Sequence, residues 1–342
     1  MKNKKGNENV DLIKQAEAVF KDNFPMQTCF ERAIFFSWYC GIADCKYCYM
    51  STQREKIEAA KGKGQMARRT DASLIAEALL CKKLGWEIGF LSGGHNAYDK
   101  EDFLELLRKL HVATGEKFWL NIGPLSKDEF ELFLPYAKGY VASIETVNKR
   151  LHDFVCPSKP IAPFEKSLKI ARDLGLKTGM TIILGLGETI EDFPLLKEFI
   201  SNHKIDKIHF YSLNPQKGTV FENSEPITKE YQAEWIAMTR IAFPKIDIQC
   251  GIWLDKVENI ELLLRAGANS ISKFPALRYF NSKYAKEVER QAKNAGREFI
   301  GTLTKMPDFG ENELNHSRFS QELSEEIVKK AKQYLKRMNQ KR

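Results

Sequence analysis

The chain has 342 residues, of which 43% are hydrophobic and 11% aromatic. That length suits one large barrel or two medium domains, and the composition excludes disorder for most of the chain. No apolar run approaches the roughly 18 residues of a membrane span, and the basic N-terminus lacks the apolar stretch of an export signal. We therefore expect a cytoplasmic protein that does not enter a membrane.

Basic residues outnumber acidic ones by 53 to 45, which gives a formal net charge of +8. Lysines are spread along the chain, and no arginine-rich stripe with interleaved aromatic residues, typical of nucleic-acid binding, is present. We interpret the charge as solvated lysine faces, with a positive pocket for an anionic small molecule as the alternative. No nucleic-acid partner is expected.

A helical pattern over Val10–Lys21 comes first, and short β-type runs then alternate with helical runs from about residue 30 to residue 300. Helix starts are marked by capping boxes at Ser126–Glu129 and Thr189–Asp192, and a helical tail is expected at Gln321–Met338. The eight predicted strands are Glu31–Trp38, Ile88–Ser92, Phe118–Ile122, Tyr140–Ile144, Thr178–Leu184, Lys207–Ser212, Asp247–Gly251 and Ser270–Ser272.

Eight strands that alternate with eight helices indicate an α/β fold, a complete (β/α)8 TIM barrel. We divide the chain into an N-terminal helical extension (1–29), the barrel (30–300) and a C-terminal helical tail (301–342). Active sites of such barrels lie at the carboxyl ends of the strands. The segments that follow the strands are therefore the candidates for function.

A cysteine cluster follows the first predicted strand, where Cys40, Cys45 and Cys48 lie within nine residues. A structural zinc site needs a fourth ligand, for which His95 and His152 are the candidates. Three thiolates instead suit a [4Fe–4S] cluster with one iron open to a substrate or cofactor. The iron–sulfur interpretation is favoured, and zinc remains the alternative. The other cysteines are scattered, at Cys29, Cys81, Cys156 and Cys250.

A cysteine trio after the first strand of a barrel resembles the radical S-adenosylmethionine (SAM) superfamily. The usual spacing there is C-x3-C-x2-C, whereas this chain has C-x4-C-x2-C. Glycines after the second strand, an acidic residue that ends the fourth, and the run GMTIILGLGET at the fifth also resemble that superfamily. The resemblance implies a [4Fe–4S] cluster on the trio and SAM contacts at Gly93, Gly94, Ser143, Glu145, Gly185 and Tyr47.

Nearly the whole chain resembles the biotin-synthase-like branch of that superfamily, notably in LLLRAGANSI. Biotin synthase has a second, sacrificial cluster, but Trp119 and Gly179 stand where it has two cluster cysteines. Sulfur insertion by that route is therefore not expected. Phe164 stands where the branch has an arginine for the SAM carboxylate, and Lys159 or Lys166 is a substitute.

Within that branch, the chain resembles the HmdB (HcgA) family of [Fe]-hydrogenase maturases. The similar runs are SWYCGIADCKYCYMS, FLSGGHNAY and GANSISKFPALRYFNSKYAKEVERQAKNAGREFIGTLT. The resemblance implies reductive SAM cleavage, hydrogen abstraction from a small substrate, and a role in forming the pyridinol ring of the guanylylpyridinol cofactor. The alternative is another branch member, a HydE-like maturase or a PylB-like mutase. Either activity needs a low-potential electron donor, ferredoxin or flavodoxin.

Substrate contacts are expected on the sixth predicted strand and just beyond it. His209 and Tyr211 alternate along that strand, so they point to the same side, and Asn214 follows at the rim. Cys156 and Cys250 also fall near the rim. The sequence assigns no residue to the catalytic step itself.

Overall fold

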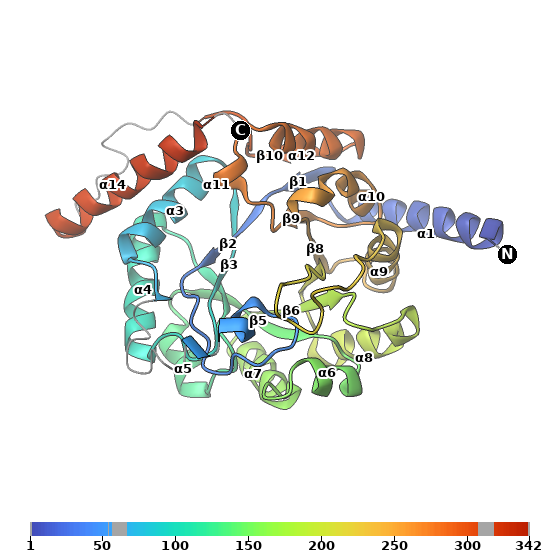
Figure 1. Cartoon of the computed structure of the whole chain (residues 1–342), viewed down its shortest axis with the longest axis horizontal. Coiled ribbons are helices and arrows are strands. Elements are labelled where there is room, and N and C mark those ends of the chain that lie inside the picture. The colour runs from blue at the N-terminus through green and yellow to red at the C-terminus, as the bar shows by residue number, and fades with distance from the viewer. Residues whose placement is uncertain (1, 54, 57–66, 307–317, 341–342) are drawn as a thin grey trace.

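The computed structural model describes residues 2–53, 55–56, 67–306 and 318–340. Its centre is a ring of parallel strands enclosed by helices (Figure 1). The barrel strands are β2 (Glu31–Phe35), β3 (Glu87–Ser92), β4 (Phe118–Asn121), β5 (Ala137–Glu145), β6 (Lys177–Leu184), β7 (Lys207–Ser212), β8 (Asp247–Gly251) and β9 (Ser270–Ser272). The eight-strand prediction is confirmed.

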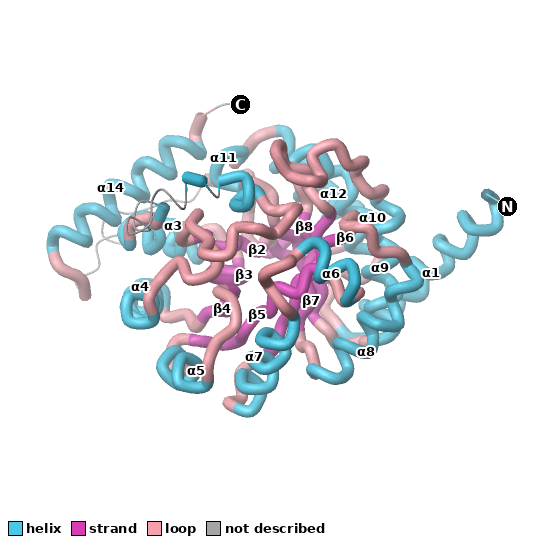
Figure 2. Tube along the Cα trace, turned by 60° about the horizontal axis from the view of Figure 1, so that its bottom comes forward, coloured by secondary structure: helices cyan, strands magenta, loops and turns pink. Residues whose placement is uncertain are grey.

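Each strand pairs with the next in chain order, from β2 to β9. The ring is nearly closed, and an isolated parallel bridge between Phe30 and Ile271 joins its two ends. The enclosing helices follow the strands in turn (Figure 2). They are α3 (Asp71–Lys83), α4 (Lys100–Thr114), α5 (Lys127–Phe133), α6 (Lys149–Val155), α7 (Ile161–Asp173), α8 (Phe193–His203), α9 (Lys229–Ala242), α10 (Ile260–Arg265), α11 (Ala276–Tyr279) and α12 (Lys283–Asn294).

Local sequence signals account for several helix starts. The Ser126 side chain accepts a hydrogen bond from the Glu129 backbone N–H while the Glu129 carboxylate accepts one from the Ser126 N–H, so the predicted capping box is present. The box at Thr189 and Asp192 is also present, ahead of α8. These reciprocal bonds satisfy backbone donors that helix geometry leaves unpaired.

Four elements lie outside the barrel ring. The N-terminal helix α1 (Lys2–Asn23) begins before the expected Val10, and the tail helix α14 has the expected bounds, Gln321–Met338. A short parallel pair, β1 (Gln27–Cys29) with β10 (Glu298–Ile300), was not predicted. None of the helices in the described part of the chain is long and apolar enough to cross a membrane.

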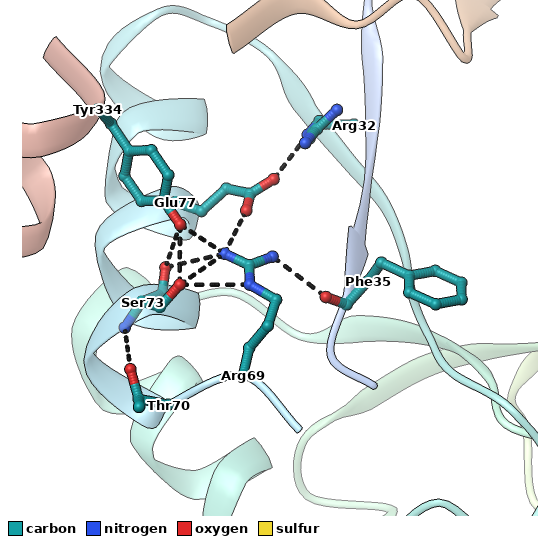
Figure 3. A network of polar contacts seen from close by, with 7 residues as sticks. All are labelled: Arg32, Phe35, Arg69, Thr70, Ser73, Glu77 and Tyr334. Atoms are coloured by element: carbon teal, nitrogen blue, oxygen red, sulfur yellow. Dashed lines mark hydrogen bonds and ion pairs between the residues drawn. The ribbon is translucent and has the colours of Figure 1, made fainter. Parts of the chain in front are cut away.

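The tail helix is fastened to the barrel by a buried polar network (Figure 3). The Glu77 carboxylate on α3 lies 2.6 Å from Arg32 and 2.6 Å from Arg69. The Tyr334 hydroxyl on α14 lies 2.8 Å from the Ser73 hydroxyl and accepts a hydrogen bond from Arg69. The network joins β2, α3 and α14 in one place.

The barrel interior contains an apolar layer of Phe90, Trp119 and Val141. The indole of Trp119 lies over two glycines, because a Cβ on Gly139 would lie 2.4 Å from the ring and one on Gly179 would lie 3.3 Å from it. Trp119 and Gly179, two positions singled out in the sequence, are thus packed against each other inside the barrel.

Candidate active site at the carboxyl ends of the strands

The loop after β2 carries the three clustered cysteines and is tied to two neighbouring loops. The Gly41 N–H donates to the His95 carbonyl oxygen at 2.7 Å, which joins this loop to the one after β3. The Lys46 N–H donates to the Val155 carbonyl oxygen at 2.9 Å, which joins it to the end of α6. As barrel geometry predicts, the segments that follow β2, β3 and β5 meet at one rim.

The two glycines after β3 are required by protein contacts. A Cβ on Gly94 would lie 1.9 Å from the Tyr39 carbonyl oxygen and 2.6 Å from Cα of Cys40. A Cβ on Gly93 would lie 2.3 Å from the Phe36 ring. Glycine is therefore needed here for the close approach of the cysteine loop, a reason that the sequence did not reveal. The predicted contact of Gly93 and Gly94 with SAM is independent of this packing and stays a prediction.

The thiols of the trio lie in different surroundings. Cys40 Sγ accepts a hydrogen bond from the Ala43 N–H at 3.4 Å. Cys156 packs beside Cys45, and the interaction between the two thiols lowers the pKa of Cys45 and raises that of Cys156. Burial raises the pKa of Cys48 to about 11. A neighbouring fourth thiol was not expected, because Cys156 is more than 100 residues away along the chain.

The donor set fits an iron–sulfur cluster better than a single ion. Within the described residues, no three His, Cys, Asp or Glu side chains are arranged to hold one metal ion. A zinc site needs ligands at about 2.0–2.3 Å from one centre. A [4Fe–4S] cluster instead takes its thiolates on different iron atoms, so they stand farther apart. Three thiols on one half-buried loop therefore suit a [4Fe–4S] cluster.

Glu145, the last residue of β5, is buried and forms an ion pair. Its backbone is in the left-handed region at φ 66°, and its Oε1 lies 2.8 Å from Nζ of Lys159. Oε2 accepts a hydrogen bond from the Thr181 hydroxyl at 3.2 Å. Burial alone would lower the pKa of Lys159, but Glu145 raises it above its usual range. Two residues named separately from the sequence are thus in direct contact.

Ser143 lies two residues before Glu145 on β5, and Gly185 directly follows the neighbouring strand β6. The half-buried Ser143 hydroxyl donates to Oδ1 of Asn121 at 2.7 Å. The Gly185 backbone has φ 103°, and its N–H donates to the Glu188 carboxylate at 2.7 Å, as does the Leu186 N–H at 2.9 Å. Glu188 fixes the turn after β6, a role that the motif GLGE did not disclose.

A cavity of about 630 Å³ opens beside the cysteine loop. Tyr47, Cys48, Tyr211 and Asn214 line it, and the last two are predicted substrate contacts. His209 lies outside this lining, fully buried, with its ring 5.2 Å from that of Phe90. Sequence reasoning did not single out four further lining residues, which are Glu31, Arg32, Trp253 and Lys273.

Comparison with known proteins agrees with this geometry. The Radical SAM superfamily model matches residues 39–200, which contain the trio, both glycines and Glu145. An uncharacterized protein of Methanocaldococcus jannaschii is 37% identical over 96% of this chain and 92% of its own length. This chain belongs to the radical SAM superfamily. It is an enzyme that uses a [4Fe–4S] cluster and SAM.

Sequence relatives and solved structures from the biotin-synthase-like branch are also similar to this chain. Biotin synthase of Thermotoga neapolitana is 24% identical over 69% of this chain and 80% of its own length. The crystal structure of methylornithine synthase (PylB) superposes with a TM-score of 0.69, covering 84% of this chain and 88% of that one at 21% identity. This superposition shows the barrel fold that the sequence predicted. The sequence relatives indicate a radical SAM enzyme of the biotin-synthase-like branch.

Proposed function

We propose that Cys40, Cys45 and Cys48 each bind one iron of the cluster and leave the fourth iron open. The shared loop, the thiol donor set and the contact with the Gly93–Gly94 turn support this assignment. When bound there, the cluster would supply the electron for reductive cleavage of SAM and hence the radical chemistry proposed for the substrate. The electron comes from a low-potential donor, ferredoxin or flavodoxin.

We further propose that SAM lies along the rim between the cysteine loop and β6. Its amino group is assigned to the turn at Gly93 and Gly94, and its ribose to Glu145. The barrel walls then keep water from the reacting atoms. Residues that complete the proposed SAM site are Ser143, Gly185 and Tyr47.

Lys159 is a poor choice for the SAM carboxylate as the site stands, because Glu145 already pairs with its ammonium group. Lys166 is exposed on α7, and Phe164 is buried there. If the SAM carboxylate binds Lys159, the ammonium group must contact both that carboxylate and Glu145. We propose that Glu145 and Lys159 both contact SAM while they stay paired, with Glu145 toward the ribose.

We propose that the enzyme forms the pyridinol ring of the guanylylpyridinol cofactor of [Fe]-hydrogenase, in the cytoplasm, without nucleic-acid or membrane partners. One observation carries this proposal. The three runs that resemble HmdB are far apart in sequence, yet Cys48, Gly94 and Lys273, one from each, lie at one site. Gly94 packs against Cys40, and Cys48 and Lys273 line the same cavity.

The test is complementation of a methanogen strain that lacks its own pyridinol-forming enzyme. Expression of this chain should restore the guanylylpyridinol cofactor, measured by mass spectrometry of purified [Fe]-hydrogenase. The Cys45→Ala variant is the control and should not restore it. A parent chain that cleaves SAM but restores no cofactor would contradict the pathway and favour a HydE-like or PylB-like activity.

A further inference from the structure

The cavity beside the cysteine loop has three charged side chains in its lining, Glu31, Arg32 and Lys273. The Glu31 carboxylate lies 2.6 Å from Nζ of Lys207. The Arg32 guanidinium lies 2.6 Å from the carboxylate of Glu77, which extends from α3 toward Arg32 and Arg69 (Figure 3). Both charges are therefore already balanced by the protein.

Lys273 differs from these two residues because it has no anionic partner within the described part of the chain. Its ammonium nitrogen lies 4.4 Å from the centre of the Tyr211 ring and 5.9 Å from that of Trp253. Aromatic faces attract a cation but do not neutralise it. Glu145, the carboxylate whose charge acts on Lys273, is paired with Lys159.

The backbone holds Lys273 in this position. Lys273 directly follows β9 with a left-handed φ of 66°, a conformation that costs free energy for a lysine. Beneath it, Gly251 leaves space for both neighbours, because a Cβ there would lie 2.3 Å from the Tyr211 ring and 3.1 Å from Cγ of Lys273. The ammonium group is thus placed in the cavity by local structure.

We propose that Lys273 binds a carboxylate of the substrate, so that the substrate is a small organic acid with an apolar body. The rest of the lining supports the apolar part, with Phe35, Ile183 and Trp253 among its residues. Burial lowers the pKa of Lys273, as expected of a cation that lacks its counter-ion until a ligand arrives. This inference rests on the proposed function, in which the substrate occupies this cavity.

The test measures whether the cavity prefers an acid to its amide. The anaerobically reconstituted protein is titrated by calorimetry with benzoate against benzamide, hexanoate against hexanamide, and nicotinate against nicotinamide. At least one acid should bind about tenfold or more tightly than its amide. Lys273→Met should remove that preference without weakening amide binding, and Lys273→Arg should keep most of it. Lys217→Met, at an exposed lysine outside the lining, is the matched control and should behave like the parent.

Two results would overturn the assignment. One is an acid-to-amide ratio near one for all three pairs in the parent protein. The other is a Lys273→Met variant that loses SAM affinity by the same factor, together with competition between SAM and the acids, which would give the lysine to the SAM carboxylate. If the parent protein prefers acids but never cleaves SAM, the proposed function fails while the acid site stands.

Discussion

Nζ of Lys159 lies 2.8 Å from Oε1 of Glu145, and the two side chains are only 12% and 8% exposed. Glu145 ends β5, and Lys159 lies just before α7, so the ion pair joins a barrel strand to the loop above it. Removal of either side chain from a pair as buried as this one should destabilise the fold, because the remaining charge would lie uncompensated in the interior.

Replacement of Glu145 should affect both the affinity for SAM and the stability of the fold, and the two effects can be measured separately. Glu145→Ala should raise the dissociation constant of SAM about ten- to a hundred-fold, and Glu145→Gln should raise it less, because an amide oxygen still accepts hydrogen bonds. Glu145→Ala should also lower the free energy of unfolding by about 3–5 kcal/mol, since Lys159 loses its partner. Equilibrium dialysis and urea titration measure the two effects.

The double variant Glu145→Ala/Lys159→Met is the control for that experiment. It should recover much of the lost stability, because no unpaired buried charge remains. Its SAM affinity should stay low. A double variant that binds SAM as tightly as the parent would show that neither member of the pair contributes to SAM binding.

The proposed cluster ligands are tested against their neighbour Cys156. Cys40→Ala, Cys45→Ala and Cys48→Ala should each abolish formation of 5′-deoxyadenosine and reduce bound iron. Cys156→Ala should keep both, since Cys156 only packs beside Cys45 and is not assigned to iron. Iron analysis and chromatography of the product decide the matter. If Cys45→Ala retains full iron and activity, the assignment is wrong.

The indole of Trp119 leads us to expect a single cluster. Reconstituted protein should contain about four irons per chain, all in one [4Fe–4S] centre. Trp119→Ala should lower the free energy of unfolding by about 3–5 kcal/mol, because it leaves a void in the packed layer over Gly139 and Gly179. A reproducible count near six irons, with a [2Fe–2S] spectrum that survives loss of the trio, would restore the sulfur-insertion interpretation.

His209 should make stability depend on pH. Burial, followed by the charge of Lys207, lowers the pKa of His209 to about 4, from an ordinary value of 6.5. The unfolded chain therefore binds a proton more readily, and stability falls as the pH drops from 6.5 toward 4. Between pH 7.5 and pH 5 this group should remove about 2 kcal/mol. Urea titrations of the parent and of His209→Gln should diverge by that amount, and parallel curves would contradict the prediction.

Glu77 and Tyr334 test the network beneath the tail helix. Glu77→Gln should lower the free energy of unfolding by about 3–5 kcal/mol, because Arg32 and Arg69 both lose their buried counter-charge. Tyr334→Phe removes the hydrogen bond from the Arg69 guanidinium and the neutral one with the Ser73 hydroxyl. It should lower the free energy of unfolding by about 1–2 kcal/mol. Thermal unfolding should rank the two variants in that order. Equal effects would mean that the ion pairs add nothing beyond the hydroxyl.

The fold was predictable where its signals are local. Short β-type runs between helical runs predicted all eight barrel strands, and capping residues such as Ser126 marked helix starts. The first strand was predicted to reach Trp38, but it ends at Phe35. Beyond it, Ser37 forms an antiparallel bridge with Arg68, and the Trp38 N–H donates to the Ala67 carbonyl oxygen. The pairing of β1 with β10 left no signal, since three-residue strands show no periodicity.

The candidate site was predictable to the same extent. The spacing of Cys40, Cys45 and Cys48 and the residues at strand ends are local patterns, and the barrel brings them to one rim. Contacts across the rim were not predictable, as with Cys156 beside Cys45 and Lys159 beside Glu145. Lys273 lay within a run that resembles HmdB, but only the ring faces of Tyr211 and Trp253 reveal its place.

The pairing of β1 with β10 sets the order in which the protein matures during synthesis. Gln27 leaves the ribosome early, but its partner Glu298 is made 271 residues later. At about 5–20 residues per second, β1 waits roughly 15–55 seconds for its neighbour. During that interval its edge is open, and only its three-residue length limits pairing with another chain. Slower translation of the C-terminal third should therefore increase aggregation of the nascent protein.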